Sequence, residues 1–433
     1  MQTMQDSGIP WLGSVPNHWS RGKLKQYIFE ISEKNTPVKT TDILSLTNKL
    51  GVVPYEEKGN QGNTAKEKYD EYKLAYPDTI VANSMNILIG SVGYCSYFGC
   101  VSPVYYVFKN FKNGNLRYIN YVFQTTEFQK CLRQFSNGIL EIRQRVSAKT
   151  ILNQDFFFPT LDEQNMIVEY LDTKCAQIDT IIAKVQSVIE KLQEYKRAII
   201  TNAVVKGLDL TVEMADSGIE WIDSIPNHWK INRLIFSAYI RARLGWKGLK
   251  ADEYTSEGHP FLSAVNIQND KLVWEDLNFI NDNRYDESPE IKLELGDLLL
   301  VKDGAGIGKC AIVDQLPYGT ATTNSSLGVI TPYSELNSMY LYYFFESAIF
   351  QNYISRIKNG MGVPHLTQGN LKNIMVVIPP YCEQEAIVAY LDDKCSNLDS
   401  IILKKQTLID KLIEYKKSLI YEVVTGKKEV PHV

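Results

Sequence analysis

The sequence has few of the residues that build catalytic and metal centres. Its 433 residues include 5 histidines and 7 cysteines, and no two cysteines are spaced as C-x-x-C. Because the cysteine number is odd and no such pair exists, neither a disulfide framework nor a zinc cage is indicated. Cys175 and Cys395 occupy matching places in the repeat described below. We interpret them as small, buried apolar residues.

Long apolar runs and a strong charge imbalance are also missing. No uninterrupted apolar run approaches the ~18 residues of a membrane helix, and the N-terminal residues MQTMQDSGIPW lack the basic and apolar regions of a signal peptide. We therefore expect a cytoplasmic protein that contacts no membrane. The 46 basic and 50 acidic side chains give a net charge of −4. This balance disfavours a protein that coats nucleic acid everywhere, but it is compatible with a local basic groove.

The sequence does contain an internal repeat. The segment DSGIPWLGSVPNHW at residues 6–19 returns as DSGIEWIDSIPNHW at residues 216–229, with 10 of 14 positions identical. Each copy is followed by a variable body and then by a long helical pattern, and the chain is longer than one typical core. We therefore expect two bodies at residues 1–160 and 216–380, and two long helices with their linker and tail at residues 161–215 and 381–433.

The two helical patterns, at residues 163–206 and 383–425, carry apolar residues at alternating spacings of three and four. This is the seam of a coiled coil. Lys196, Lys405 and Lys416 interrupt it. Because the helices match in length and seam, we expect them to pack antiparallel about an approximate two-fold axis, with the bodies at opposite ends. The predicted seam residues are Leu171, Cys175, Ile178, Ile182, Val185, Ile189 and Leu192 in the first helix, and Leu391, Cys395, Leu398, Ile402, Ile409 and Leu412 in the second.

Each body has the pattern of an α/β domain, in which short strand-like runs precede one aromatic helix. The helix is expected at about residues 118–135 in the first body and 339–358 in the second. The predicted fold class is therefore α/β, with two globular domains separated by an antiparallel coiled coil. The strand-like runs are residues 43–46, 79–82, 104–108 and 156–159 in the first body, and 298–301, 311–313, 327–330 and 375–380 in the second.

One glycine-rich turn resembles a cofactor loop. The segment LLLVKDGAGIGKC at residues 298–310 lacks the G-x-G-x-x-G spacing, and the AIV that follows Lys309 is typical of a strand rather than a helix. As a phosphate loop it has Asp303 at the first glycine position and Cys310 at the Ser/Thr position. A cofactor site is thus disfavoured. Two interpretations stay open: a structural turn, or a turn that brings Lys302 and Lys309 to nucleic acid phosphates.

Two further lookalikes have plain structural interpretations. Ile378 stands where an amino-methyltransferase has an Asn or Asp before Pro-Pro-aromatic, and an apolar side chain cannot bond the target amine. His18 and His228 are repeat equivalents, which favours a structural turn beside a buried tryptophan over a general base. His259 has no recognisable partner, and His432 lies in a tail.

A polar, basic stretch follows each aromatic helix at matching places. Arginine, lysine, asparagine and glutamine carry donors that read base edges, while lysine and serine can hold phosphates. A solvated loop without a ligand is the alternative. The candidate DNA contacts are Arg133, Asn137, Arg143, Arg145 and Ser147 in the first body, and Lys302, Lys309, Arg356, Lys358, Asn359, His365 and Thr367 in the second.

With this doubled layout, the chain resembles the specificity subunit of type I restriction-modification systems. The resemblance covers essentially the whole length. The first body departs from it by lacking a copy of the VKDGAGIGK turn, and we expect residues 83–86 and 90–93 in its place. The resemblance rests on both D-S-G-I-x-W and P-N-H-W segments, on Pro159, Glu163 and Gln164 with their counterparts Pro379, Glu383 and Gln384, on the EYK blocks at Glu194 and Glu414, and on LLLVKDGAGIGK.

The resemblance implies two target recognition domains, each reading one half of a split site in double-stranded DNA. The helices would act as a ruler and as a seat for two methyltransferase subunits, and restriction subunits would join the complex. The chain itself would be no enzyme and would hold no metal or cofactor, since S-adenosylmethionine, ATP and Mg are expected on partner subunits.

The residues also leave other protein classes open. A coiled-coil adaptor would show no salt-dependent binding to duplex DNA. A small-molecule enzyme built on the glycine turn would bind S-adenosylmethionine or a nucleotide without partners. Within the DNA-reading class, the specificity subunit of another restriction system is an alternative.

Overall fold

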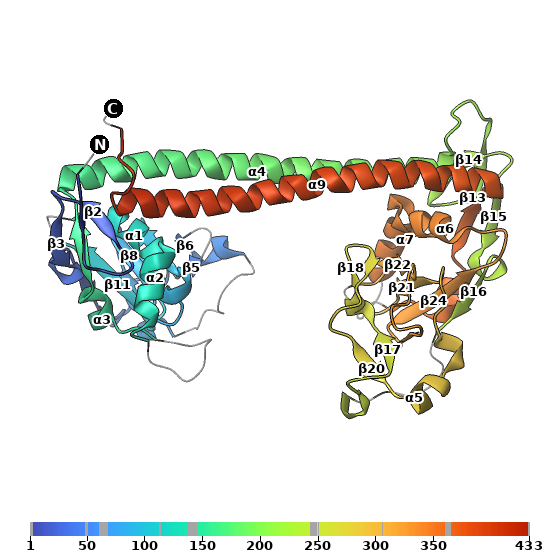
Figure 1. The fold of residues 1–433 in the computed structure, drawn as a ribbon, viewed down its shortest axis with the longest axis horizontal. Coiled ribbons are helices and arrows are strands. Elements are labelled where there is room, and N and C mark those ends of the chain that lie inside the picture. Colours follow the sequence, from blue (N-terminus) through green and yellow to red (C-terminus); the bar gives the residue numbers. More distant parts are fainter. Residues whose placement is uncertain are drawn as a thin grey trace. The chain divides into compact units, whose positions relative to one another are not determined.

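The computed structural model describes residues 3–47, 51–59, 68–111, 114–136, 145–242, 249, 251–304, 306–359 and 365–431. The chain divides into two compact units. Unit 1 comprises Met1–Gln186 and Thr407–Val433, and unit 2 comprises Ser187–Gln406. Each of the two long helices, α4 (Leu161–Lys206) and α9 (Tyr381–Val424), begins in one unit and ends in the other (Figure 1). Within the described ranges, no helix is both long and apolar enough to cross a bilayer.

The centre of unit 1 is a four-stranded antiparallel sheet with the order β4-β11-β8-β9. Strand β8 is buried along its whole length, although only its three central residues are apolar. In β11, Val107 lies opposite Ile31 of β4 and Val81 of β8. The strands of unit 1 are β1 (Met4–Asp6), β2 (Ser14–Pro16), β3 (Ser20–Lys23), β4 (Ile28–Ile31), β5 (Leu44–Thr47), β6 (Gly51–Pro54), β7 (Lys73–Ala75), β8 (Thr79–Asn83), β9 (Val92–Cys95), β10 (Gly99–Val101), β11 (Tyr105–Asn110) and β12 (Asp155–Phe158).

Unit 2 has the same central sheet, in the order β16-β24-β21-β22, and β21 is again buried throughout. The strand-like runs predicted in the two bodies coincide with β5, β8, β11 and β12, and with β21, β22, β24 and β25. The strands of unit 2 are β13 (Met214–Ile219), β14 (Ile222–Pro226), β15 (Lys230–Arg233), β16 (Ala238–Arg241), β17 (His259–Leu262), β18 (Ile267–Gln268), β19 (Lys271–Leu272), β20 (Asn278–Ile280), β21 (Leu298–Val301), β22 (Cys310–Ile312), β23 (Thr322–Thr323), β24 (Leu327–Pro332) and β25 (Met375–Ile378).

The prediction of one aromatic helix in each body is wrong, because each body has two. Unit 1 has α1 (Leu116–Gln124) and α2 (Thr126–Arg133), and unit 2 has α6 (Ser338–Glu346) and α7 (Ala348–Asn359). The residue at each break, Thr125 or Ser347, is extended, and its hydroxyl donates to the carbonyl three residues earlier, at 2.8 and 2.6 Å. A side chain that bonds its own backbone in this way competes with the helix. Short helices complete the units: α3 (Ala148–Leu152), α5 (Asp282–Asp286) and α8 (Gln368–Lys372).

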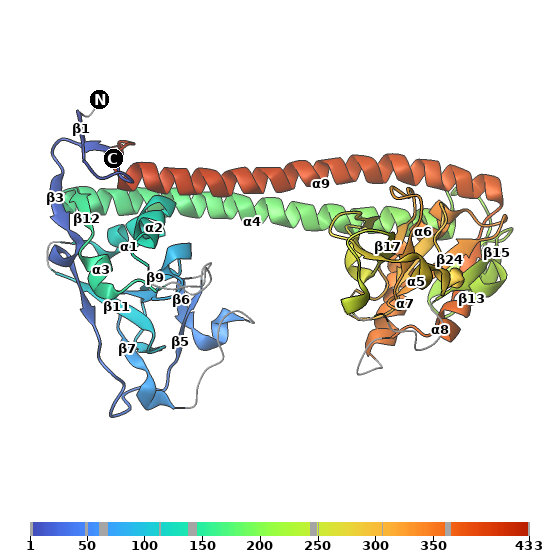
Figure 2. The ribbon, with the colours of Figure 1, turned by 60° about the horizontal axis from the view of Figure 1, so that its bottom comes forward.

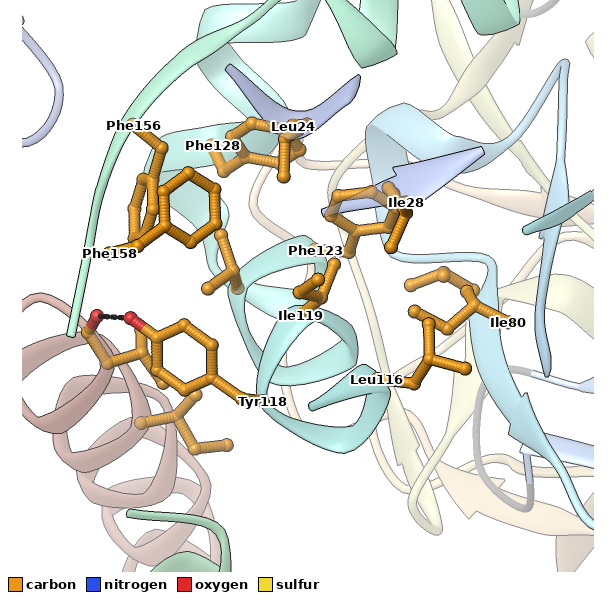
Figure 3. Packing of buried hydrophobic residues seen from close by; sticks show 14 of the residues in the cluster. Leu24, Ile28, Ile80, Leu116, Tyr118, Ile119, Phe123, Phe128, Phe156 and Phe158 are labelled. Carbon is orange, nitrogen blue, oxygen red and sulfur yellow. Dashed lines mark hydrogen bonds between the residues drawn. The ribbon is translucent and has the colours of Figure 1, made fainter. Parts of the chain in front are cut away.

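The ends of the long helices belong to the cores of the units. In unit 1, Tyr118 of α1 is fully buried, and its hydroxyl donates to the carbonyl of Val424 at the end of α9, at 2.8 Å (Figure 3). In unit 2, the equivalent hydroxyl of Tyr340 donates to the carbonyls of Val204 in α4 and Val377 in β25, both at 3.0 Å. Each body is therefore fixed to the end of a long helix.

In each unit the two long helices lie side by side and antiparallel (Figures 1 and 2). Lys416 Nζ lies 2.7 Å from both carboxylate oxygens of Asp179 in unit 1, and Lys196 Nζ lies 2.7 and 2.8 Å from those of Asp399 in unit 2. Two of the lysines that interrupt the seam thus have a partner on the facing helix. Among the predicted seam residues, Ile182, Val185, Leu192, Ile402 and Leu412 are half-buried, and Leu171, Cys175, Ile178, Ile189, Leu391, Cys395, Leu398 and Ile409 are buried.

Candidate nucleic-acid interface

One edge of each unit brings together two segments that the sequence singled out. The chain just before the short helix α3 or α8 lies against the turn that follows the middle strand β8 or β21. The amide of Val146 donates to the carbonyl of Ser84 at 3.3 Å, and the amide of Leu366 donates to that of Lys302 at 2.8 Å. These matched bonds place Arg145 and His365 beside the two turns. We call these edges the turn edges of units 1 and 2.

The glycine-rich turn of unit 2 connects two antiparallel strands. β22 follows it directly, so the prediction of a strand after Lys309 is confirmed. The amide of Gly308 donates to the carbonyl of Val301 at 2.9 Å, and Gln351 Nε2 holds the carbonyl of Gly308 at 3.0 Å. Gly308 has φ +91°, and an added Cβ would lie 2.9 Å from Ile354 Cγ2, so this position requires glycine. A turn between strands has no helix N-terminus with which to cradle a phosphate.

The corresponding turn in unit 1 runs from Asn83 to Ser91, in the place expected for residues 83–86 and 90–93. It joins β8 to β9 and includes a single helical turn at Ile87–Ile89. Asn83 Oδ1 accepts from the amide of Met85 at 3.0 Å, and the amide of Asn83 donates to the carbonyl of Ser91. The scaffold at the edge is thus shared by the units, while the side chains that it presents differ.

Charge is arranged differently at the two turn edges. In unit 2, Asp303 bonds the Nδ1 atom of His365 with one oxygen, and its other oxygen lies 3.6 Å from Lys302 Nζ. The His365 side chain is 46% exposed, whereas that of Lys302 is 12% exposed. In unit 1, Arg145 is exposed beside the uncharged residues Ser84 and Met85.

The other candidate contacts are spread over several elements. Arg133 is exposed in the last turn of α2, and Lys309 is exposed just before β22. Arg356, in α7, lies 3.4 Å from Glu220. Asn137 and Arg143 lie outside the described residues. Lys358 and Asn359 are in α7, but their side chains are outside what is described.

Ser147 and Thr367 have local partners. Each is the N-cap of a short helix, where its hydroxyl accepts from the amide of Thr150 or Asn370, at 3.0 and 3.1 Å. Each hydroxyl also bonds the side chain of the same residue, at 2.8 and 2.9 Å. Capping is therefore the role that the geometry gives to these hydroxyls.

The two copies of the repeated segment, residues 6–19 and 216–229, bind the ends of both long helices. The sequence analysis did not predict this role. His18 Nε2 lies 2.6 Å from Glu163 Oε1 in the first turn of α4, and His228 Nε2 lies 2.7 Å from Glu383 Oε1 in the first turn of α9. Both histidines lie in a turn beside a buried tryptophan, as the sequence predicted. Burial acts to raise the pKa of Glu163, but hydrogen bonds from His18 and Thr160 lower it overall.

The tryptophan that follows each histidine packs on the end of the other helix. Trp19 lies against Gly426, just after α9, where an added Cβ would come within 3.0 Å of the indole and 2.5 Å of Pro16. Trp229 lies against Gly207, just after α4, in the same way. Each segment therefore holds the start of one helix and the end of the other. The sequence does contain a signal for this role, because the pair His18 and Glu163 recurs in the second half as His228 and Glu383.

Two glutamines complete this fastening. Gln164 and Gln384, the second residues of the paired EQ motifs, are buried. Gln164 accepts from the amide of Asn115 at 2.9 Å and donates to the carbonyl of Pro159 at 3.1 Å. Gln384 accepts from the amide of Asn337 at 2.8 Å and donates to the carbonyls of Pro379 and Glu335. The elements retained in both halves thus join body to helix.

A partly buried acidic group, Glu346, distinguishes unit 2. Burial, followed by the negative charge of Asp270, raises the pKa of Glu346 at the end of α6 to about 7. Cys310 Sγ donates to its carboxylate at 3.3 Å. Gln124 occupies the same place at the end of α1 and is uncharged. Within the described residues, no group of three His, Cys, Asp or Glu side chains is arranged to hold a metal ion.

Comparisons with a family model and with individual proteins point to the same family. Residues 16–191 and 246–412 match the family described as "Type I restriction modification DNA specificity domain". The chain is 23% identical over 291 residues to the type I restriction enzyme MjaVIII specificity subunit of Methanocaldococcus jannaschii, covering 66% of this chain and 65% of that protein. It is 22% identical over 273 residues to the EcoKI specificity subunit of Escherichia coli K12, covering 62% and 56%. The matches thus span less than two thirds of either relative's length.

The fold has counterparts among solved structures. One comes from work on "complex assembly and conformational transition of the type I R-M system", with a TM-score of 0.69, 14% identity, and coverage of 96% of this chain and 99% of that chain. The HsdS subunit from Thermoanaerobacter tengcongensis gives a TM-score of 0.50 and 13% identity, covering 96% and 98%. At these identities the likeness concerns the fold. Since the family match covers well over half of its residues, the chain belongs to the family of type I restriction-modification DNA specificity domains.

Proposed function

We propose that this chain is the sequence-reading subunit of a type I restriction-modification complex, and that each unit reads one half of a bipartite, non-palindromic site in double-stranded DNA. One observation carries the proposal. The two units keep the same sheet, the same fastening residues and the same turn edge, yet Ser84 and Arg145 stand in unit 1 where Lys302 and His365 stand in unit 2. A shared scaffold with different polar side chains fits two readers of different sequences.

The chemistry at each turn edge favours different bases. Arginine only donates hydrogen bonds, and its fork matches the O6 and N7 acceptors of guanine. Histidine can donate or accept through a single ring nitrogen, and lysine offers a point charge to phosphates or acceptors. Different half-sites are therefore expected, which makes the full site non-palindromic.

The long helices are proposed to set the spacer between the half-sites. A helix of 46 residues, such as α4, spans about 69 Å at the usual rise per residue. Major grooves facing one side of a duplex recur about every 34–36 Å. In this proposal the helix pair keeps the two readers one or more turns apart, so that the spacer has a fixed length and a free sequence.

The outer faces of the helices are proposed to seat two methyltransferase subunits. Each helix carries exposed apolar residues at heptad spacing, away from the seam: Ile181, Val188 and Tyr195 on α4, and Ile401, Leu408 and Tyr415 on α9. Large exposed apolar side chains in a pattern mark an interaction surface. The same pattern on both helices fits two copies of one partner. In this proposal the chain has no catalytic role, and the cofactors and ATP are bound by partner subunits.

Two alanine variants test the reading role. The chain is produced together with the proposed methyltransferase subunits, and binding is measured to duplexes that differ at single base pairs. Arg145→Ala should relax preference in one half-site only, and His365→Ala in the other only, by about 1–3 kcal/mol if a base contact is lost. Arg21→Ala, which removes an exposed arginine paired with Asp155, is the matched control and should leave base preference unchanged.

The outcomes separate the possible roles. A loss that is uniform over all sequences would assign phosphate contacts to these residues. Binding that neither variant changes would remove both residues from the interface. A complex with no salt-dependent binding to duplex DNA would contradict the proposed function and would favour a coiled-coil adaptor.

A further inference from the structure

We propose that Asp303 is a positioning residue that fixes the orientation and tautomer of His365, so that unit 2 reads a base amino group, adenine N6 or cytosine N4, through His365 Nε2. The proposal rests on the proposed function. Its observation is the contact of Asp303 Oδ1 with His365 Nδ1, supported by a backbone bridge between the same two residues. The amide of Leu366 also holds the carbonyl of Lys302 at 2.8 Å, which fixes the segment that carries the histidine.

The carboxylate decides which ring nitrogen carries the proton. An ionised carboxylate only accepts hydrogen bonds, so Nδ1 must donate to Asp303, and Nε2 of the neutral ring then has a lone pair. The second oxygen of Asp303 lies 3.6 Å from Lys302 Nζ. Among the residues that the structure describes, the charged residues bonded to the histidine segment are Asp303 and Lys302. The ring is 46% exposed, so it can reach a ligand while Nδ1 stays engaged.

An acceptor in the major groove selects a limited set of bases. The amino groups at adenine N6 and cytosine N4 are the donors that base pairs present there, whereas guanine presents only acceptors on its edge. A neutral His365 held in this tautomer therefore favours a base with an amino group. Protonation converts Nε2 into a donor and reverses this preference.

Unit 1 provides an internal comparison. Arg145 occupies the place of His365, but Met85 stands where unit 2 has Asp303. Arginine has no tautomer to fix, because it donates from every nitrogen at any relevant pH. A carboxylate is therefore needed beside the histidine and not beside the arginine. This difference predicts that only one half-site responds to pH.

The test uses the full chain in complex with its methyltransferase subunits. Dissociation constants are measured by fluorescence anisotropy for duplexes in which each base pair of both half-sites is varied, at pH 8 and pH 6. The variants are Asp303→Ala, Asp303→Asn, His365→Ala and the double variant Asp303→Ala/His365→Ala. Asp282→Ala is the matched control, since it removes another carboxylate that bonds a histidine of unit 2, His259, at 2.9 Å.

We expect wild type to discriminate at one base pair by about 5- to 150-fold, the range of one good base contact. Asp303→Ala should lose most of this discrimination, and Asp303→Asn should retain most of it because the amide oxygen accepts the same bond. The double variant should match His365→Ala, because the two residues act as a unit. At pH 6 the wild-type preference should weaken at this base pair alone, and the control should behave as wild type.

Two results would overturn the inference while leaving the proposed function intact. One is that Asp303→Ala keeps the wild-type discrimination. The other is that Asp303→Ala and Asp303→Asn weaken binding to all duplexes equally and the pH step is absent, which would mark a merely structural pair. If wild type itself prefers no sequence, the proposed function fails and the inference fails with it.

Discussion

Replacing Gln384 with leucine should destabilise unit 2 more than replacing Gln164 with leucine destabilises unit 1. Leucine nearly keeps the side-chain volume but cannot hydrogen-bond, so the buried and part-buried backbone groups that each glutamine bonds lose their partner. Gln384 makes three such bonds and Gln164 makes two. At roughly 1–2 kcal/mol for each stranded group, the expected losses are about 3–6 and 2–4 kcal/mol. The one additional bond accounts for the difference.

Hydrogen exchange measured by mass spectrometry reports on the two units separately, which global unfolding does not guarantee in a protein with two cores. Peptides that contain the start of α6 should exchange faster in the Gln384→Leu variant, and those that contain the start of α1 should exchange faster in the Gln164→Leu variant. Gln186→Leu, at an exposed position of α4, is the control and should change protection by less than about 0.5 kcal/mol. Equal effects from all three leucines, or faster exchange in the wrong unit, would refute this reasoning.

Three further predictions concern other parts of the molecule. Burial, and then the charge of Asp270, raise the pKa of Glu346 to about 7. The stability of unit 2 that depends on a protonated Glu346 is therefore fully present below the unfolded pKa near 4.5 and is lost as the pH rises through 7. Glu346→Gln should therefore stabilise unit 2 at pH 8, by up to about 3 kcal/mol, and flatten this pH dependence. Hydrogen exchange of unit 2 peptides, corrected for intrinsic exchange rates, would reveal this across pH 4–8; protection identical to wild type at every pH would contradict it. Inserting four residues near Ser187, with a matching insertion in α9, should lengthen the helices by about 6 Å and change the preferred spacer but not the half-sites, as methylation mapping can check; an altered half-site with an unchanged spacer would contradict it. At pH 7 a maleimide should label the exposed Cys382 much faster than the buried Cys395, because burial raises the pKa of Cys395 to about 11. Mass spectrometry of the labelled peptides measures the two rates, and equal rates would contradict the prediction.

The sequence predicted the elements that depend on local information. A heptad pattern predicts the long helices without any knowledge of the rest of the fold. The repeat located the matching bodies, and the departure of AIV from a helical pattern correctly predicted a strand after Lys309. In each case the residues that carry the signal are close together in the chain.

The sequence did not reveal what depends on distant partners. Lys196 and Lys416 interrupt the apolar seam, and only the structure pairs them with Asp399 and Asp179, each more than 200 residues away. The break in each aromatic helix was missed because a threonine such as Thr125 is also common inside helices. The sequence does not show that its hydroxyl bonds the backbone carbonyl three residues earlier. These contacts depend on the three-dimensional fold, so a pattern of residues along the chain does not reveal them.

The candidate interface was predicted in part. Matched positions in the repeat correctly placed a unit 1 turn in the region of Asn83, and the structure brings Arg145 and His365 to the two turn edges. Asp303 was noted only as a misfit in a phosphate loop, because its contact with His365 crosses 62 residues. The roles of Asn137 and Arg143, outside the described residues, stay predictions.

The most direct test of two different recognition units on a shared scaffold is a map of every methylated base in DNA from cells that express this chain with the proposed partner subunits. The account predicts modification within two short, dissimilar motifs separated by a spacer of fixed length and free sequence. A single contiguous palindrome would contradict it.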